Sequence, residues 1–134
     1  MKQLPGQMRI VFKQNPLPAS MHPFARGAAL ASIAAQNQGK FWEYHDTLFE
    51  NQQHITREDL TSWAKVVGLD LARFEKDMAD PATSARIDAD QREANLSGAS
   101  GTPTIFLNGR RVKGSLSSAD AVVDLIKSEI LKEE

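Results

Sequence analysis

The chain has 134 residues, of which 41% are apolar and 25% are charged, and these proportions are typical of one globular domain with its own hydrophobic core. The formal net charge of −1 argues against a nucleic-acid-binding surface, which needs a basic stripe. No run approaches the roughly 18 apolar residues of a membrane helix, and the N-terminus lacks the apolar core of a signal peptide. There is no cysteine, which excludes disulfides, thiolate metal sites and a cysteine nucleophile in this chain but assigns no redox compartment.

The N-terminal third predicts a strand, a loop and two helices. The β-branched and aromatic run at 8–13, "MRIVFK", predicts a strand, and the Pro-rich stretch at 14–23 predicts a loop. The Ala-rich segment 23–38 predicts a helix that begins with proline. The helix expected at 40–53 carries one broad apolar face, formed by Phe41, Trp42, His45, Leu48 and Phe49.

Three capping signals mark the helices that follow. The sequence from Thr56 to Asp59 resembles a capping box and predicts a helix that ends at Gly68. Asp70 predicts the N-cap of a short helix. Asp80 and Pro81 predict the start of a longer, polar helix with a thin apolar stripe.

The C-terminal part predicts a hairpin and a helix. Asn108-Gly109 lies between two short apolar runs and predicts a two-residue hairpin turn, because both turn residues need positive φ. The adjacent Arg110 and Arg111 are interpreted as solvated hairpin residues rather than a phosphate site. Ser117 predicts the N-cap of the last helix, whose expected buried stripe is Val122, Val123, Ile126 and Ile130. The order of strand, helices, hairpin and helix is a mixed α/β pattern.

Side chains that could carry catalysis are few. The three histidines have spacings that match no metal motif: His22, His45 and His54. We interpret His45 as packed and hydrogen-bonded on the apolar face of its helix, with pairing to Glu43 or Asp46 as an open alternative. The other two histidines are expected in solvent. Two tryptophans fall on helical apolar faces and are interpreted as core residues: Trp42 and Trp63.

Two stretches carry a resemblance to a known family. "GASGTPTIFLNGRRVKG" resembles the cis-proline loop and following hairpin of bacterial DsbA-type thiol–disulfide oxidoreductases, and "QGKFWEYHDTLF" resembles the first insertion helices of that family. The resemblance covers essentially the whole chain. It implies a single thioredoxin-like α/β domain over 1–134, with a helical insertion at 23–96 and the cis-proline loop, hairpin and C-terminal helix at 97–134.

The resemblance also implies a binding site. In the family, the loop at Gly101, Thr102 and Pro103 faces the redox-active cysteines, the proline bond is cis, and the neighbouring backbone pairs with an extended peptide substrate. We therefore expect substrate binding at these three residues through strand addition. The expected partner is an extended peptide or protein segment, and no metal, cofactor, nucleic acid or membrane is expected.

One departure from the family decides the expected activity. Family members carry Cys-X-X-Cys at the start of a helix that follows the first strand, and dithiol exchange needs a thiolate. In this chain that strand and most of that helix are absent, and "MKQLPGQ" resembles the tail of the helix. We expect no catalytic residue here and no disulfide exchange by this chain alone. A longer member would carry its cysteines upstream, together with any export signal to the periplasm.

The missing strand would lie between 9–12 and 104–107 and would leave two unpaired strand edges. We expect one of two repairs: the two strands pair with each other, or a second chain fills the gap as a homodimer or strand-swapped assembly. Two other functions stay open. The chain could be a non-catalytic peptide-binding or interaction module, or a glutathione-binding relative similar to kappa-class transferases and isomerases.

Overall fold

The computed structural model describes residues 6–52, 55–112 and 119–133. They belong to two compact units. Lys13–Gly98 forms the first, called the helical unit. The second, called the hairpin unit, is formed by the residues on either side of it in the sequence, up to Phe12 and from Ala99.

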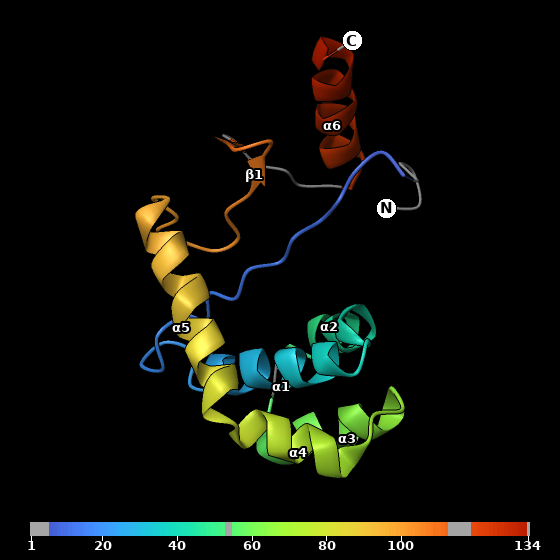
Figure 1. Ribbon diagram of the computed structural model, residues 1–134, viewed down its shortest axis with the longest axis vertical. Helices are drawn as coiled ribbons and strands as arrows, with labels where there is room; N and C mark the ends of the chain where they lie inside the picture. Colours follow the sequence, from blue (N-terminus) through green and yellow to red (C-terminus); the bar gives the residue numbers. More distant parts are fainter. Residues whose placement is uncertain (1–5, 53–54, 113–118, 134) are drawn as a thin grey trace. The chain divides into compact units, whose positions relative to one another are not determined.

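The helical unit is built around α1, which lies between the other helices of the unit (Figure 1). Its helices have these bounds: α1, Ala25–Asn37; α2, Phe41–Glu50; α3, Arg57–Val66; α4, Leu71–Ala79; α5, Pro81–Leu96. Helix α1 contacts each of the other four. These close approaches need small side chains on α1, and Ala31, Ala34 and Ala35 are all fully buried.

Larger side chains from the neighbouring helices fill the core around these alanines. Tyr44 of α2 and Phe74 of α4 are fully buried, and their ring centroids lie 5.8 Å apart. The Tyr44 hydroxyl donates a hydrogen bond of 2.8 Å to the carbonyl oxygen of Leu60 in α3. Burial raises the pKa of Tyr44 above its usual range. A second, smaller cluster joins α1 to α5 through Ile33 and Ile87.

The capping residues expected from the sequence are confirmed. The Thr56 hydroxyl accepts from the Asp59 amide, and the Asp59 carboxylate accepts from the Thr56 amide, which completes the capping box of α3. Asp70 caps α4 by accepting from the amide of Arg73. Asp80 caps α5, and its carboxylate accepts from the Ala82 amide next to the proline of the first turn.

The chain enters the helical unit through a buried polar clip. Gln14 is 7% exposed, and its side-chain amide donates a hydrogen bond of 2.8 Å to the Ser32 hydroxyl of α1. The backbone amide of Gln14 donates to the Asp90 carboxylate of α5 at 2.9 Å. The Lys13 ammonium lies 3.1 Å from the Glu93 carboxylate. These bonds fix the start of the Pro-rich loop to α1 and α5.

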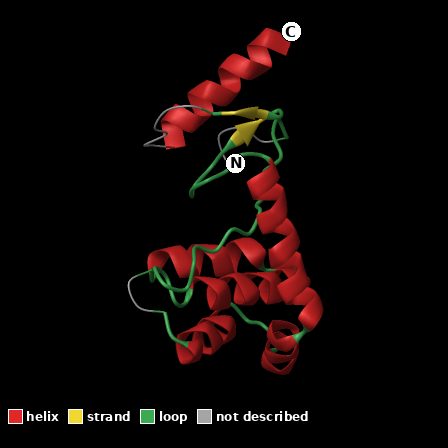
Figure 2. Cartoon of the chain, turned by 90° about the vertical axis from the view of Figure 1, so that its left-hand side faces the viewer, coloured by secondary structure: helices red, strands yellow, loops and turns green. Residues whose placement is uncertain are grey.

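The hairpin unit contains the only strands among the described residues, and they are short (Figure 2). Strand β1, Phe106–Leu107, pairs antiparallel with β2, Arg110–Arg111. The turn residues Asn108 and Gly109 have φ of 49° and 80°, so the expected two-residue hairpin turn is confirmed.

The strand expected at 8–13 is not formed. The described residues 8–13 are irregular, and the sheet contains β1 and β2 alone. A strand needs a hydrogen-bonded neighbour, and no described segment pairs with this one, so its β-forming side chains do not produce a strand by themselves. Of the two expected repairs, the pairing of this segment with 104–107 is therefore not formed among the described residues.

The last helix, α6, spans Ala119–Glu133. Its expected apolar stripe is half-buried rather than buried at Val122, Val123 and Ile126. The side chain of Ile130 and the expected cap at Ser117 lie outside the residues whose placement is described. None of the described helices is both long and apolar enough to cross a membrane.

Candidate functional site

The candidate site begins where α5 ends. Gly98 follows the last turn of α5 with φ of 76°, a conformation that favours glycine, and the buried Ala99 comes next. Gly101, Thr102 and Pro103 are then all exposed, and the Thr102–Pro103 peptide bond is cis. We call Gly101–Thr104 the Thr-Pro loop.

One side-chain bond shapes this loop. The Thr104 hydroxyl donates a hydrogen bond of 2.6 Å to the carbonyl oxygen of Gly101. This bond closes a short turn around Thr102 and Pro103. Proline has no amide hydrogen, and it stands at the entrance of β1, where no donor is needed for the pairing with β2.

The backbone of β1 bonds to β2 on one side only. The amide of Val112 donates to the carbonyl oxygen of Ile105 at 2.9 Å, and Leu107 is the register partner of Arg110. Backbone groups alternate sides along an antiparallel strand. The amide and carbonyl groups of Thr104 and Phe106 therefore point to the opposite side, which we call the outer edge of β1. In the part of the chain that the structure describes, no strand covers this edge.

Apolar side chains accompany the outer edge. Ile105 is 41% exposed and Phe106 is 43% exposed. The same unit contains three consecutive apolar residues that are also exposed: Ile10, Val11 and Phe12. The site therefore offers unpaired backbone hydrogen-bonding groups beside exposed apolar surface, which is the arrangement that accepts an added strand.

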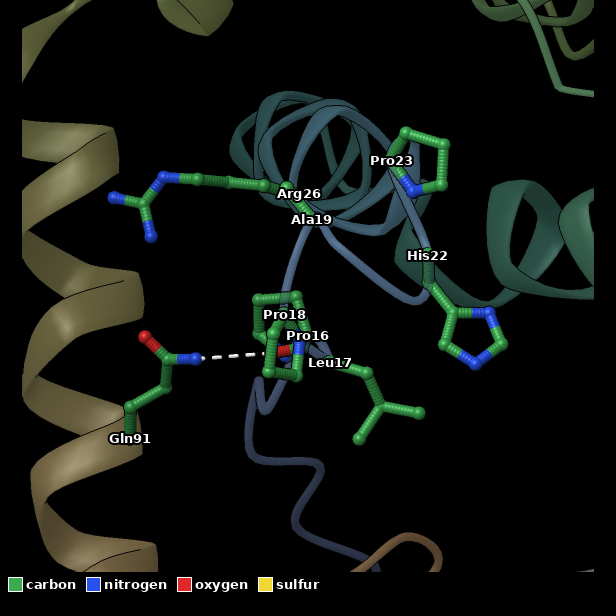
Figure 3. A pocket seen from close by; sticks show the side chains of 8 residues that line it. All are labelled: Pro16, Leu17, Pro18, Ala19, His22, Pro23, Arg26 and Gln91. Atoms are coloured by element: carbon green, nitrogen blue, oxygen red, sulfur yellow. Dashed lines mark hydrogen bonds between the residues drawn. The ribbon is translucent and has the colours of Figure 1, made fainter.

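A hollow on the helical unit is a second candidate (Figure 3). It encloses about 150 Å³ between the Pro-rich loop, the start of α1 and α5, and three of its lining residues are Pro16, Pro18 and Pro23. Two of its polar side chains, those of Arg26 and Gln91, are already used. Arg26 donates to the hydroxyl of Ser84 and pairs with the Asp88 carboxylate at 3.0 Å.

The remaining amide at this hollow is also engaged. Figure 3 shows the Gln91 side chain directed at the loop, and its amide donates to the carbonyl oxygen of Pro16 at 3.0 Å. These bonds hold the loop against α5. The hollow is therefore explained by the packing of the Pro-rich loop, and the outer edge of β1 is the stronger candidate.

The histidines are placed as follows. His45 packs against aromatic rings, with centroid distances of 5.7 Å to Phe41, 5.2 Å to Trp42 and 4.4 Å to Phe49. Its Nδ1 lies 3.1 Å from the Asp46 carboxylate, so the pairing left open in the sequence is present. His22 is exposed, as expected. His54 lies outside the described residues.

The aromatic row on α2 differs from the sequence interpretation. Trp42 is 43% exposed and Phe49 is 57% exposed, so the expectation that Trp42 is a core residue is wrong. Tyr44, one position away from His45, takes the core position of α2 instead. Trp63 does pack against the core, half-buried. A helix ten residues long cannot bury aromatic residues on all sides when it lies at the edge of a bundle.

Comparison of the sequence with known proteins identifies a family. The sequence profile of the DSBA-like thioredoxin domain family matches residues 2–127. No solved structure matches the chain.

Several curated relatives are named as Na(+)/H(+) antiporters. The Na(+)/H(+) antiporter NhaA 1 of Salinispora arenicola is 45% identical over 108 residues, which are 81% of this chain and 16% of the antiporter. NhaA of Herminiimonas arsenicoxydans is 46% identical over 94 residues, or 70% of this chain and 15% of that protein. NhaA 1 of Mycolicibacterium vanbaalenii is 35% identical over 114 residues, or 84% of this chain and 18% of the relative.

This chain thus spans less than a fifth of the length of each of these relatives, whereas the family profile covers nearly all of the chain. The family implies the thioredoxin-like α/β fold, and the described residues are mostly helical with a small two-stranded sheet. The chain belongs to the DSBA-like thioredoxin domain family.

Proposed function

We propose that the Thr-Pro loop and the outer edge of β1 bind an extended peptide by strand addition. Gly101, Thr102 and Pro103 are the binding residues of the loop, and Thr104 and Phe106 extend the same edge. The observation that carries the proposal is the unpaired backbone of Thr104 and Phe106, which has no hydrogen-bond partner among the described residues and lies beside exposed apolar side chains. Main-chain bonds supply affinity in this kind of recognition, and side chains supply specificity.

Under the same proposal, this chain does not exchange disulfides by itself. Exchange requires a thiolate that attacks a disulfide sulfur, and the chain has no cysteine. Peptide docking needs only the backbone edge, so it is independent of the thiol chemistry. The chain is then the substrate-docking part of a DsbA-like oxidoreductase or a non-catalytic peptide-binding module.

The domain organisation that accompanies this function is a single thioredoxin-like domain. Residues 23–96 would be its helical insertion, and 97–134 would carry the loop, the hairpin and the last helix. A second copy of this chain, in a homodimer or strand-swapped assembly, would compete with the peptide for the outer edge of β1.

Amide chemical shifts of the full chain, followed during titration with short extended peptides, test the proposal. We expect saturable shifts at Thr102, Thr104 and Phe106 and none in α3 or α4. Shifts confined to the helical unit, or no shift with any peptide, would overturn the proposal. Glutathione titrated in the same way tests the transferase-like alternative, which requires shifts with glutathione itself. A dilution series by light scattering reports self-association, and a dimer that loses peptide binding when it forms would favour the second copy as occupant.

A pair of variants at one position separates the backbone from the side chain. Thr104→Pro deletes the outward amide, and Thr104→Val keeps it while deleting the hydroxyl. We expect the proline variant to weaken peptide binding at least about tenfold. It removes one hydrogen bond to the peptide, and its ring obstructs the approach of the peptide strand. The valine variant should bind within about twofold of the parent, since it lacks only the bond to Gly101.

The identity with antiporters favours a second candidate function at the level of the whole protein. A sequence 45% identical to 81% of this chain occurs within a Na(+)/H(+) antiporter. We propose as this second candidate that the domain works as part of an antiporter polypeptide. An antibody to the domain, used on fractionated source cells, tests this: a product several times larger than 14.8 kDa in the membrane fraction supports it. A product of 14.8 kDa outside the membrane fraction would contradict it.

A further inference from the structure

The acidic residues among the described part of the hairpin unit all lie in α6, whereas its other segments are positively charged. The described residues 6–12 and 99–112 carry three arginines and no aspartate or glutamate: Arg9, Arg110 and Arg111. All three are exposed. The chain as a whole has a formal net charge of −1, so this concentration of positive charge is local.

The hairpin places two of the arginines on β2, across β1 from the docking edge. Arg111 is the register partner of Phe106, and Arg110 is the register partner of Leu107. Register partners have side chains on the same face, and neighbours along a strand alternate faces. One arginine therefore lies on each face of the hairpin. A strand added to the outer edge of β1 would lie two strand spacings, about 10 Å, from β2. The long arginine side chains can extend across β1 to side chains of the added strand on either face.

Exposed apolar side chains neighbour the arginines in both segments. Ile105 and Phe106 are exposed next to Arg110 and Arg111 in the hairpin. In the other segment of the unit, Arg9 directly precedes the exposed run Ile10–Phe12. Both segments thus combine an apolar centre with a cationic flank.

We propose that this site selects extended peptides with an apolar centre flanked by aspartate or glutamate. The inference rests on the proposed function and adds the class of peptide. Carboxylates on the ligand would pair with the arginine guanidinium groups, which match carboxylates in a two-bond geometry. Opposite potentials also speed encounter and disfavour basic competitors.

A second copy of this chain is a poorer occupant by the same argument. In an antiparallel pair of two copies of residues 9–13 centred on Val11, Arg9 would face Lys13. Like charges directly opposite each other destabilise a strand pair. Pairing the outer edges of two hairpins would likewise bring four arginines together.

Three acetylated peptides of one length test the inference on the full chain: Asp-Val-Thr-Val-Asp, Ser-Val-Thr-Val-Ser and Lys-Val-Thr-Val-Lys. We expect the acidic peptide to bind about tenfold more tightly than the basic one at low salt, with the neutral peptide between them. Added salt should reduce this difference, because exposed charges are screened.

Matched charge reversals locate the effect. The double variant Arg110→Glu, Arg111→Glu should reverse the order of the acidic and basic peptides. The control variant Arg86→Glu, Arg92→Glu makes the same change in net charge on exposed positions of α5 and should keep the original order. Loss of preference in both variants alike would show a net-charge effect and overturn the inference.

The two proposals fail in different ways. Equal binding of all three peptides, with shifts at Thr104 and Phe106, would overturn the acidic preference and leave peptide docking standing. Absence of binding by every peptide would overturn both. Stronger binding of the basic peptide by the parent chain would overturn the preference alone.

Discussion

The hydroxyl of Tyr44 donates a hydrogen bond of 2.8 Å to the carbonyl oxygen of Leu60, and this bond joins α2 to α3 inside the core of the helical unit. Both residues are buried, and Leu60 lies in α3. The buried Tyr44 hydroxyl therefore has a hydrogen-bond partner, and burial of this side chain leaves no donor unsatisfied.

Tyr44→Phe should lower the free energy of unfolding by about 1 kcal/mol, the usual net value of one hydrogen bond. The ring stays, so packing against Phe74 is retained. Denaturant unfolding followed by far-UV circular dichroism measures the change. Tyr44→Ala should cost more, about 3–5 kcal/mol, because it also leaves a cavity. Equal losses in the two variants would contradict the separate roles of ring and hydroxyl.

The same residue predicts a response to alkali. Burial raises the pKa of Tyr44 in the folded chain, whereas the unfolded chain releases the phenol proton near pH 10. Above that pH the folded state binds more protons than the unfolded state, so stability should fall as pH rises. Tyr44 is the only tyrosine, so phenolate absorbance reports it alone. Phenolate should appear together with unfolding, and Tyr44→Phe should flatten the decline in stability. Phenolate formation before any loss of structure would contradict this prediction.

The capping box of α3 predicts a measurable contribution from Thr56. Thr56→Val removes the side-chain acceptor of the Asp59 amide and should destabilise the chain by about 1 kcal/mol. Thr47→Val is the matched control, because its exposed hydroxyl bonds only to the carbonyl of Glu43 within α2. The control should change stability by less than about 0.5 kcal/mol. Chemical denaturation of both variants provides the comparison, and equal effects would rule out a capping role.

The small residues of α1 predict sensitivity to size. Ala34 is fully buried, so Ala34→Leu would force its neighbours apart and should cost at least about 1–3 kcal/mol. Ala85→Leu makes the same change on an exposed position of α5 and should be nearly neutral. Thermal unfolding of the two variants measures the difference. A neutral Ala34→Leu would show that α1 is less tightly enclosed than the buried alanines indicate.

Capping could be predicted from the sequence because it is local. Thr56, Asp70 and Asp80 each bond an amide two or three residues away, so the pattern of letters contains both partners. The turn at Asn108-Gly109 was predictable for the same reason, since both positions need positive φ. Family resemblance pointed to the loop at Thr102 and Pro103, which no local pattern identifies.

Features that depend on distant partners could not be predicted in this way. Residues 8–13 have the composition of a strand, but the neighbour that would make them one is not in the described chain. Trp42 looks like a core residue by helical spacing, yet Tyr44 occupies the core because the bundle covers that side of α2. The outer edge of β1 emerged only from the hydrogen-bond pattern of the hairpin.

The two units should differ in their protection from hydrogen exchange. Both core clusters lie in the helical unit, and the hairpin unit has strands of two residues each among its described residues. Short two-stranded sheets are marginal by themselves. Amides of α1 and α4 should therefore exchange only on global unfolding, and the amide of Val112, which bonds to Ile105 in the hairpin, by local opening. Native-state exchange followed by NMR measures both. Addition of a bound peptide should slow exchange in the hairpin alone, and equal protection of both units without peptide would contradict this difference.

The clip at Gln14 has a mechanical consequence. Gln14 bonds to Ser32 of α1 and to Asp90 of α5, and Lys13 pairs with Glu93 of α5. A force that pulls on the chain before residue 13 would therefore act on α1 and α5 first through these bonds. These bonds would share the load before any buried apolar contact is pulled. A pull on the segment up to Phe12 should therefore break these polar bonds before it disturbs the packing of the helices.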